Sequence, residues 1–308
     1  MAFTFPFSFI FSLFVFVLGA GISAVLFGLL AFAIFIACAY LGVIRITPLF
    51  NLMTSVMKFF WPEKVDRIAE SIRKSFVLEY PDGKPAKESQ IFLFHPHGAF
   101  TVAYFLNIGT KFMDWQSRPI KGAALHLLLN LPFAQEFFDT LHFVPSSYDA
   151  MSTVLKDGES LGVCLGGARE VLYTEAGRMR LSIARKRGVF RMAIEQGCGL
   201  VPVLTYGENE LYELNTSPWL TWLNSKCVQY GFSLPIPTWE SCERWFGILE
   251  NPLAVPVRTV VGAAVRSAAK AGPSDADISE LRERYFVALR DLYARTRPST
   301  YAETLEIV

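Results

Sequence analysis

A His-Pro-His-Gly sequence at residues 95–98 is the part of this chain best suited to chemistry. It directly follows the apolar run Ile91–Phe94, a pattern typical of a buried strand. The proline restricts the backbone, and Gly98 permits a tight turn that a ligand can approach closely. An imidazole held at a strand end is suited to take a proton from an alcohol, so His97 is predicted to be a general base and His95 a second catalytic candidate. A buried structural histidine and a metal ligand are the other interpretations of His97.

Two further histidines, His126 and His142, lie among apolar neighbours and are predicted to be core residues. Neither has the helical or cysteine-rich spacing that would supply a third and fourth metal ligand. The five cysteines are odd in number and match no metal or disulfide framework. The sequence therefore predicts no metal site, and it predicts reduced thiols on the cytosolic side of a membrane.

A carboxylate is expected near His97, because a basic imidazole usually has an acid that orients it. Glu170 ends the sequence Gly166-Gly167-Ala168-Arg169-Glu170, which follows the apolar run Leu161–Leu165. Glu170 is predicted to orient His97, and an acid stabilised at a helix N-terminus is its alternative role. Gly166 and Gly167 are predicted to present backbone N–H groups to an oxyanion.

The alternative carboxylate partner is Glu208, which follows a third apolar run, Leu200–Tyr206. Gly207, Glu208 and Asn209 are accordingly predicted to belong to the site. A basic cluster precedes and enters a predicted helix that begins at residue 188; it consists of Arg185, Lys186, Arg187 and Arg191. Basic side chains at a helix N-terminus favour an anion site, while a solvated face or attraction to anionic lipid is the alternative.

These residues follow short apolar runs that alternate with helical patterns. Strands are predicted at 91–94, 161–165, 200–206 and 259–261, and helices at 149–156 and 188–196. A last helix is predicted to open with a capping box between Asp277 and Glu280. The alternation predicts an α/β fold with a mixed sheet flanked by helices. Sites in such sheets lie outside the carboxyl ends of the strands, where the histidines, glutamates and glycines collect.

Residues 1–44 contain no Asp, Glu, Lys or Arg, and all 57 formal charges lie in the other 264 residues. The apolar stretch has about twice the roughly 20 residues of one membrane span and is interrupted near residue 20 by glycines. It is predicted to form an N-terminal apolar membrane hairpin of one or two helices that spans or dips into the bilayer. Residues 45–75 are predicted to form interfacial or connecting helices, and their basic residues assign the domain at 76–308 to the cytosol. A secretory signal peptide fits poorly, since the basic start and cleavage site are missing.

A cluster of tryptophans marks residues 219–245, where four of the six tryptophans of the chain lie. Tryptophan favours membrane interfaces, where its ring is half apolar and its N–H stays hydrated. The stretch is predicted to dip into the membrane beside the entrance to the site, with Trp219 and Trp222 exposed. Burial of these rings in the α/β core is the alternative.

Taken together, these blocks resemble the type-2 diacylglycerol acyltransferase family, which includes monoacylglycerol and wax-alcohol acyltransferases. His95–Gly98 matches its HPHG signature and residues 166–170 its GGAxE block. Residues 187–210, from the basic cluster to the Gly-Glu-Asn-Glu run, are similar to its longest block, and 259–262 match its TVVG. Val102 stands where glycerolipid acyltransferases of another type carry an aspartate five residues after the histidine.

The resemblance implies an acyltransferase-like fold and an acyl-CoA-dependent O-acyltransferase that makes triacylglycerol from diacylglycerol. Monoacylglycerol or a long-chain alcohol is the alternative acceptor. It implies no metal, no cofactor beyond acyl-CoA as co-substrate, and no covalent acyl-enzyme, with the basic cluster at 185–191 holding the phosphates of acyl-CoA. The expected location is the endoplasmic reticulum membrane and lipid droplets, with the catalytic domain facing the cytosol.

Composition narrows the partners further. The net charge of +1 gives no basic excess for nucleic acid, and 52% hydrophobic with 19% charged residues excludes disorder. The expected partners are acyl-CoA, an acylglycerol and a membrane, and homo-oligomerisation is left open. A non-catalytic protein that shapes or coats lipid droplets is the alternative of another class, but it would not require the ordered motif blocks.

Overall fold

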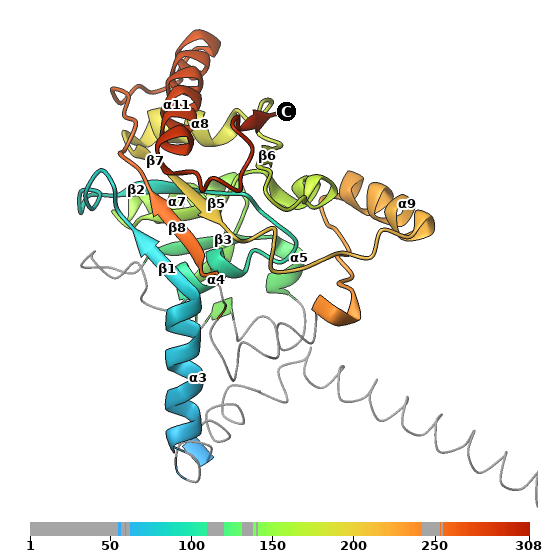
Figure 1. Cartoon of the computed structure of the whole chain (residues 1–308). Helices are drawn as coiled ribbons and strands as arrows, with labels where there is room; N and C mark the ends of the chain where they lie inside the picture. The colour runs from blue at the N-terminus through green and yellow to red at the C-terminus, as the bar shows by residue number, and fades with distance from the viewer. Residues whose placement is uncertain are drawn as a thin grey trace, which may run out of the picture.

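The computed structural model describes residues 55–56, 59, 62–109, 120–130, 138–139, 141–241, 253 and 255–308. Figure 1 shows a sheet covered by helices on both faces, with one helix extending away from it. The helices are α3 (Pro62–Ser75), α4 (Val102–Gly109), α5 (His126–Leu129), α7 (Tyr148–Lys156), α8 (Gly188–Gln196), α9 (Pro218–Cys227) and α11 (Asp275–Thr296), with 3₁₀ turns η1 (Gly167–Tyr173) and η2 (Val228–Tyr230).

The main sheet has seven strands in the order β1-β8-β7-β2-β5-β3-β4. Their bounds are β1 Phe76–Glu79, β2 Gln90–His95, β3 Lys121–Ala124, β4 Phe143–Pro145, β5 Leu161–Cys164, β7 Gly199–Tyr206 and β8 Val257–Val261, while β6 (Arg180–Leu181) pairs with β9 (Glu306–Ile307) in a separate two-stranded sheet. Every pair in the main sheet is parallel except β7 with β8. The carboxyl ends of β2, β5 and β7 therefore meet at one edge, next to the amino ends of β1 and β8.

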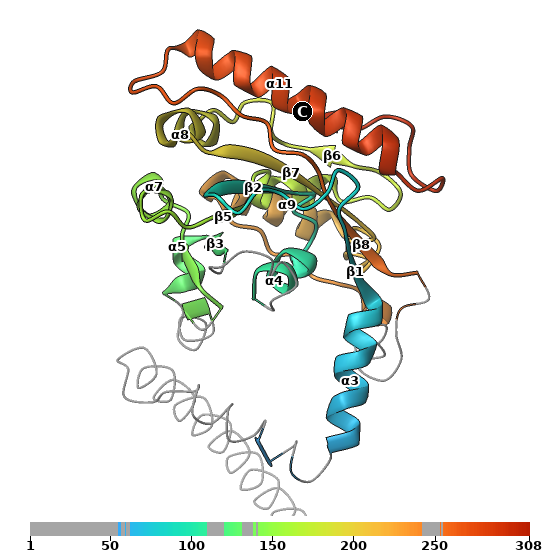
Figure 2. The same ribbon diagram turned by 90° about the vertical axis from the view of Figure 1, so that its left-hand side faces the viewer.

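The central strands are buried because they carry apolar residues on both faces. Every residue of β2 and β7 is buried, as expected for strands covered on both sides. One face, with Leu93 and Leu204, packs against α8 and α11, and the other, with Phe92 and Val203, packs against α4. Figure 2 shows α11 and α8 on one side of the sheet and α4 on the other.

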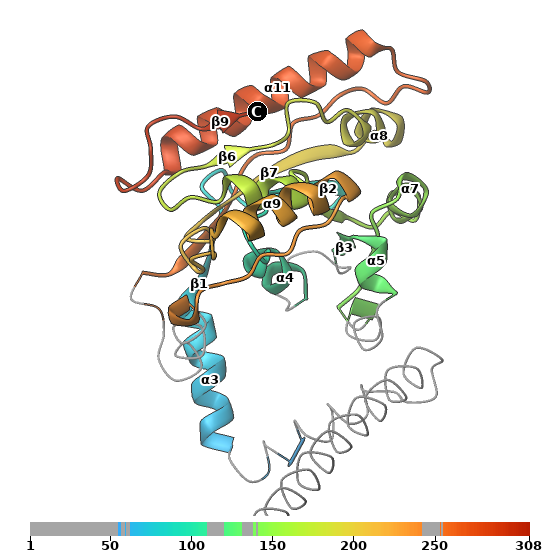
Figure 3. The same cartoon turned by 90° about the vertical axis from the view of Figure 1, so that its right-hand side faces the viewer.

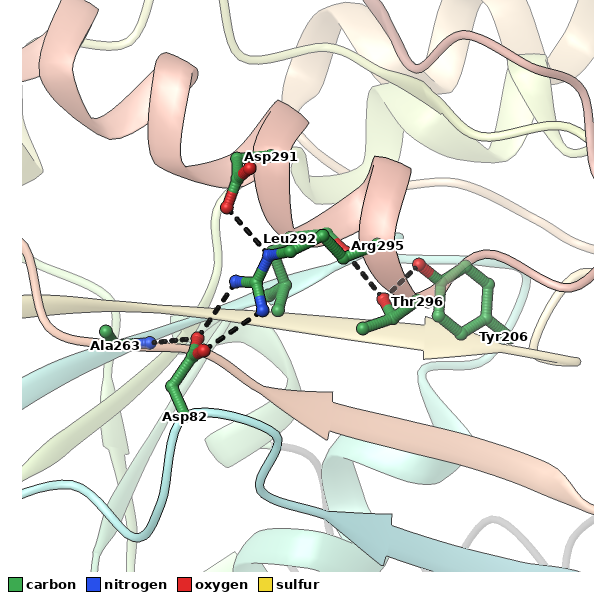
Figure 4. A network of polar contacts seen from close by, with 7 residues as sticks. All are labelled: Asp82, Tyr206, Ala263, Asp291, Leu292, Arg295 and Thr296. Carbon is green, nitrogen blue, oxygen red and sulfur yellow. Dashed lines mark hydrogen bonds and ion pairs between the residues drawn. The ribbon is translucent and has the colours of Figure 1, made fainter.

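The C-terminal helix α11 is held over the sheet by polar contacts as well as by its apolar face. Arg295 donates to both carboxylate oxygens of Asp82, at 3.0 and 3.1 Å, and to Asp291 at 2.8 Å. Asp82 also accepts from the backbone N–H of Ala263 at 3.2 Å, so one carboxylate joins α11 to the loops after β1 and β8 (Figure 4). Hydrogen bonding to Arg295 lowers the pKa of Asp82.

The predicted strands and helices are found with small changes at their ends. Residues 91–94, 161–165, 200–206 and 259–261 fall mainly in β2, β5, β7 and β8, and α7, α8 and α11 correspond to the predicted helices. The capping box of α11 was predicted three residues too late. Ser274 is the N-cap. The backbone N–H of Ser274 donates to the carboxylate of Asp277, and the backbone N–H of Asp277 donates to Ser274 Oγ. Asp277 therefore completes the box, and the helix begins at Asp275.

The predicted fold combined the α/β sheet with an N-terminal membrane hairpin, and that combined prediction is wrong. The mixed sheet flanked by helices is present, but the part of the chain that the structure describes contains no membrane hairpin. Across the described residues, no helix combines the length and the apolar character needed to cross a bilayer. The segment 1–44, to which the hairpin was assigned, lies outside the described residues.

Candidate functional site

The His-Pro-His-Gly turn leaves the sheet at the carboxyl end of β2. His95 ends that strand, fully buried, and His97 is half-buried in the turn that follows. Gly98 has a φ of +62° and lies against Glu208, whose Cγ would be 2.7 Å from a Cβ added at that glycine. The turn thus needs glycine for its backbone angle and for the close approach of the carboxylate.

The His97 ring is set up to accept a proton. Its Nδ1 lies 3.0 Å from the carbonyl oxygen of Gly98, which can only accept, so Nδ1 carries the hydrogen and Nε2 keeps its lone pair. Burial lowers the pKa of His97, and the bond to Gly98 partly offsets that effect. The imidazole is therefore neutral at physiological pH, with one nitrogen held and the other available as a base.

Glu170 reaches His97, but through the main chain. One carboxylate oxygen accepts from the backbone N–H of His97 at 2.7 Å, and the other accepts from that of Ser182 at 2.7 Å. Glu170 was predicted to orient the imidazole ring, whereas the structure brings it to the peptide that carries the ring. It fixes the position of the turn and links it to the segment before α8.

Gly166 has a steric role that the sequence motif did not reveal. It was predicted, with Gly167, to offer backbone N–H groups to an oxyanion. A Cβ at Gly166 would lie 1.8 Å from the carboxylate carbon of Glu170, so this glycine makes room for the buried acid. Gly167 differs, since it has a φ of +65° and open space where a Cβ would stand.

Glu208 holds the other side of the same turn. Its two oxygens accept from the backbone N–H groups of Val102, at 2.8 Å, and Ala103, at 3.0 Å, at the start of α4. Val102 is the position at which the sequence lacks an acid, and the structure supplies one there from the end of β7. These bonds satisfy N–H groups that have no partner within the helix.

Both glutamates are buried acids next to the turn. Burial raises the pKa of Glu170 to about 7 and that of Glu208 to about 7, while the backbone hydrogen bonds act in the opposite direction. Cys164, at the carboxyl end of β5, lies near both, and burial together with the two negative charges raises the pKa of its thiol. The sequence analysis did not single out Cys164, although its place at a strand end was a signal for it.

The remaining residues of the Gly-Glu-Asn-Glu run hold neighbouring loops. Asn209 donates to the carbonyl oxygens of Glu175, at 3.4 Å, and Arg178, at 3.0 Å. The backbone N–H of Gly207 donates to the hydroxyl of Tyr301 at 2.8 Å, and that hydroxyl donates to Glu210 at 2.8 Å. Asn209 and Gly207 thus support the site without carrying a reactive group, and Tyr301 is a contributor that the sequence analysis missed.

His95 faces away from His97 into the core between the sheet and α11. Its Nε2 lies 2.9 Å from the hydroxyl of Tyr285, and its ring is fully buried. Burial lowers the pKa of His95 to about 3. His95 was predicted as a second catalytic residue, and this environment gives it a structural place instead.

The stability of the protein is expected to depend on pH through His95. In the unfolded chain this histidine takes up a proton below about pH 6.5, but the buried ring does so only near pH 3, so the folded state loses stability as pH falls through this interval. Between pH 6.5 and 5, urea unfolding should show wild type losing about 1.5 kcal/mol more than His95→Gln. Glu170 and Glu208 are present in both proteins and cancel in the comparison. Equal losses would mean that His95 titrates normally in the fold.

The basic cluster lies on the surface at the start of α8. Arg185, Lys186, Arg187 and Arg191 are all exposed, and Arg187 forms an ion pair of 2.7 Å with Asp275 of α11. Lys186 is close enough to Glu170 to lower the pKa of that acid. The structure therefore brings Lys186 near Glu170, beside the turn at 95–98, while Arg187 pairs with Asp275 of α11.

The prediction that His126 and His142 are core residues is wrong, because both are exposed. His126 begins the short helix α5, and its Nδ1 lies 3.0 Å from the side-chain nitrogen of Asn130. His142 lies in the turn before β4 and itself has a φ of +61°. Apolar neighbours in sequence did not imply burial here, since both histidines lie in loops and a short helix at the periphery.

Comparison with known proteins supports the resemblance noted in the sequence. A profile of the family described as "Diacylglycerol acyltransferase" matches residues 77–306. Mouse 2-acylglycerol O-acyltransferase 1 is 33% identical over 215 residues, which cover 66% of this chain and 64% of the mouse protein. Diacylglycerol O-acyltransferase 2A of Umbelopsis ramanniana is 30% identical over 233 residues, 71% of this chain and 65% of that protein. The matches thus span a little under two thirds of these relatives.

Among solved structures, the 1-acyl-sn-glycerophosphate acyltransferase PlsC from Thermotoga maritima aligns with a TM-score of 0.42 and 14% identity, covering 86% of this chain and 97% of that one. The family profile takes in the turn at 95–98, the glycine-glutamate block at 166–170 and the run at 207–210. The resemblance drawn from these motifs is therefore confirmed, and the chain belongs to the diacylglycerol acyltransferase family.

Proposed function

We propose that this chain is an acyl-CoA-dependent O-acyltransferase that transfers a fatty acyl group to the free hydroxyl of diacylglycerol, forming triacylglycerol. The observation that carries the proposal is the neutral His97 imidazole, whose Nδ1 is held by Gly98 while Nε2 stays free to accept a proton. The family is described as diacylglycerol acyltransferases, and acyl transfer to a hydroxyl is a reaction in which such a base would act. A base of this kind typically contributes about 10²–10⁴-fold to a rate.

The proposed reaction begins when Nε2 of His97 takes the proton of the acceptor hydroxyl. The resulting oxygen nucleophile attacks the thioester carbonyl of acyl-CoA, and the negative charge moves to the carbonyl oxygen. Collapse of this tetrahedral species forms the ester and breaks the carbon–sulfur bond. The CoA thiolate then takes the proton from the His97 imidazolium, which restores the neutral base. No metal, cofactor or covalent acyl-enzyme is part of this scheme.

Two buried acids hold the base in its working position. Glu170 accepts from the backbone N–H of His97, and Glu208 packs against Gly98 and anchors the start of α4. Holding a reacting group within a fraction of an ångström of its productive position lowers the entropic part of the barrier. The carboxylates therefore serve as positioning residues in this proposal. The exposed basic residues Arg185, Lys186 and Arg191 are assigned to the phosphates of acyl-CoA.

A second acceptor, monoacylglycerol, has a specific observation in its favour. The mouse relative described above is a 2-acylglycerol O-acyltransferase, and proteins of that description from cattle and humans are 29% and 30% identical to this chain. A one-chain and a two-chain acylglycerol present the same kind of hydroxyl to His97. The two acceptors therefore differ in how their chains are accommodated, not in the chemistry at the base.

The proposal is tested by adding labelled oleoyl-CoA and a panel of acceptors to membranes that contain the expressed chain. Diacylglycerol, 2-monoacylglycerol and a long-chain alcohol are offered separately, and products are separated by lipid class. Labelled triacylglycerol as the main product supports the proposal. Labelled diacylglycerol from monoacylglycerol would favour the second acceptor, and no labelled ester with any acceptor would overturn acyl transfer itself.

The acceptor and product are lipids, and we propose that α9 meets the membrane surface beside the site. Trp219 and Trp222 on this helix are 64% and 62% exposed, and Ile236 in the following loop is 44% exposed. Helix α9 contacts η1, the turn that carries Glu170, and it lies at the edge towards which β7 points (Figures 1 and 3). Lys226 in its last turn adds attraction to anionic lipid. We assign the protein to the endoplasmic reticulum membrane and lipid droplets, with this domain facing the cytosol.

The two exposed tryptophans give a prediction for membrane binding. Each ring exposes on the order of 100 Å² of apolar surface, worth about 2 kcal/mol when it leaves water. The double variant Trp219→Ser with Trp222→Ser should reduce partition into anionic vesicles at least about tenfold and slow lipid turnover several-fold. Its melting temperature should change little, because neither ring is part of the core. Val287→Ser, an exposed apolar residue of α11, is the matched control, and equal partition of the two variants would exclude α9 from membrane contact.

A further inference from the structure

A cavity of about 820 Å³ lies beside the catalytic turn, at the same edge of the sheet. Its walls come from β1, the end of β7 and the residues after it, the start of β8 and the segment before it, residues 176–177 and the loop after α11. The apolar wall residues include Val77, Leu211, Leu253, Val255, Val257 and Pro298. Its volume is within the roughly 300–1,000 Å³ of cavities that hold small-molecule ligands.

The polar side chains of the cavity are bonded to one another or to the backbone. Arg258 donates to Glu79 at 3.0 Å and to the carbonyl oxygen of Thr296 at 2.6 Å, and its guanidinium lies 5.3 Å from the ring centre of Tyr206. Glu210 accepts from the backbone N–H of Gly177 at 2.8 Å and from the hydroxyl of Tyr301 at 2.8 Å. Arg258 is therefore paired with an acid and Glu210 is hydrogen-bonded, which leaves the apolar walls to make contact with a ligand.

The floor of the cavity is formed by buried side chains. Tyr206 is 2% exposed, and its hydroxyl lies 2.9 Å from Thr296 Oγ1 on α11 (Figure 4). Leu211 and Val257 are also buried. Towards the outside, Val77 is 38% exposed and Val255 is 81% exposed, so the apolar surface continues from the floor to an open rim.

A single short segment connects the cavity to the catalytic turn. Tyr206, Gly207 and Glu210 line the cavity, while Glu208, between them in sequence, packs against Gly98 and binds the start of α4. Successive residues of this segment therefore face two compartments. The cavity therefore adjoins the same segment that braces the turn carrying His97.

We propose that this cavity binds a fatty acyl chain of a substrate while the reacting carbonyl or hydroxyl lies at His97. The inference rests on the proposed acyl transfer and assigns the residues that select chain length. An apolar cavity of this size, with an open rim and with polar side chains that already have partners, fits a long hydrocarbon chain. The chain belongs either to the acyl-CoA donor or to the acylglycerol acceptor, and the chemistry of recognition is the same for both.

The test reduces the cavity from two sides in the full chain. Val77→Trp adds volume at the edge strand β1, where a large aromatic residue is well accommodated, and Val255→Trp does so at the exposed rim. Val287→Trp is the matched control, since Val287 is 65% exposed on α11 and is not among the cavity residues. Values of kcat/KM are measured with donors of eight to eighteen carbons at a fixed acceptor, and then with acceptors of short and long chains at a fixed donor.

In the cavity variants, kcat/KM for long chains relative to short chains should fall at least about tenfold, with the control unchanged. A shift confined to the donor series assigns the cavity to the acyl-CoA chain, and a shift confined to the acceptor series assigns it to the acylglycerol. Unchanged profiles in both series for both variants would overturn the inference while leaving acyl transfer intact.

Direct binding separates this inference from the proposed function. Fluorescence of cis-parinaric acid is titrated with purified wild type and with each variant. A Kd weakened about tenfold by Val77→Trp or Val255→Trp, but not by Val287→Trp, supports a chain-binding cavity even if no ester product forms. Equal Kd values in all four proteins would exclude it.

Discussion

Replacing His97 with alanine is expected to lower kcat at least 100-fold, which is the usual contribution of a general base. The Nδ1 of His97 is held by the carbonyl oxygen of Gly98 at 3.0 Å, and burial keeps the ring neutral. Alanine removes the free Nε2 but leaves the backbone N–H that Glu170 accepts. The turn should therefore keep its shape, and the loss should appear in kcat with little change in KM.

The measurement compares purified His97→Ala with wild type and with His126→Ala. His126 is an exposed histidine on α5, so its replacement controls for the loss of an imidazole outside the site. Because the pKa of His97 is lowered, protonation of the base itself should not limit activity at the ordinary histidine value of about 6.5. A folded His97→Ala protein with near wild-type turnover would show that another group removes the proton.

The central strands could be predicted from the sequence because they are continuous apolar runs. β2 and β7 are buried on both faces, so every position carries the same signal. The edge strands β1 and β4, and β3 beside β4, were not predicted, since each is only three or four residues long and partly exposed. The start of α11 was misplaced because Asp277 can serve either as a cap or as the third residue of a capping box.

The site could be predicted as a set of residues but not as a set of bonds. His97, Glu170 and Glu208 were selected because each follows a buried strand, and parallel strands bring their carboxyl ends together. The sequence carries no information on which atoms meet, and both carboxylates turn out to bind backbone N–H groups. The partners that fix the site from a distance, Tyr285 and Tyr301, come from the C-terminal part of the chain and have no local motif.

These bonds give the two histidines different roles and the two glutamates a shared one. His95 and His97 are two residues apart, yet one points to Tyr285 in the core and the other lies in the turn. Glu170 lies on η1 after β5 and Glu208 lies just after β7, yet both acids hold the same turn, from two sides. In the proposed mechanism the reactive group is thus a single imidazole, and most of the motif residues around it hold the backbone that carries it.

Gly166→Ala is therefore expected to lower kcat about 100-fold, although this residue bears no functional group. Its φ of −64° and ψ of −36° are helical values that alanine adopts readily, so the backbone does not oppose the change. The added Cβ would lie 1.8 Å from the carboxylate carbon of Glu170, and the buried acid must move away from the N–H of His97. The loss should match that of Glu170→Ala, measured by kcat on purified protein.

A double-mutant cycle separates this mechanism from general damage to the fold. If Gly166→Ala acts only by displacing the carboxylate, then adding it to Glu170→Ala should cost little more, and the two effects will be strongly non-additive. Additive losses would mean that the alanine disturbs the turn by another route. Near wild-type activity in Gly166→Ala would show that the bond between Glu170 and the His97 peptide is dispensable, and the main-chain positioning of the base would then have to come from Glu208 and Gly98 alone.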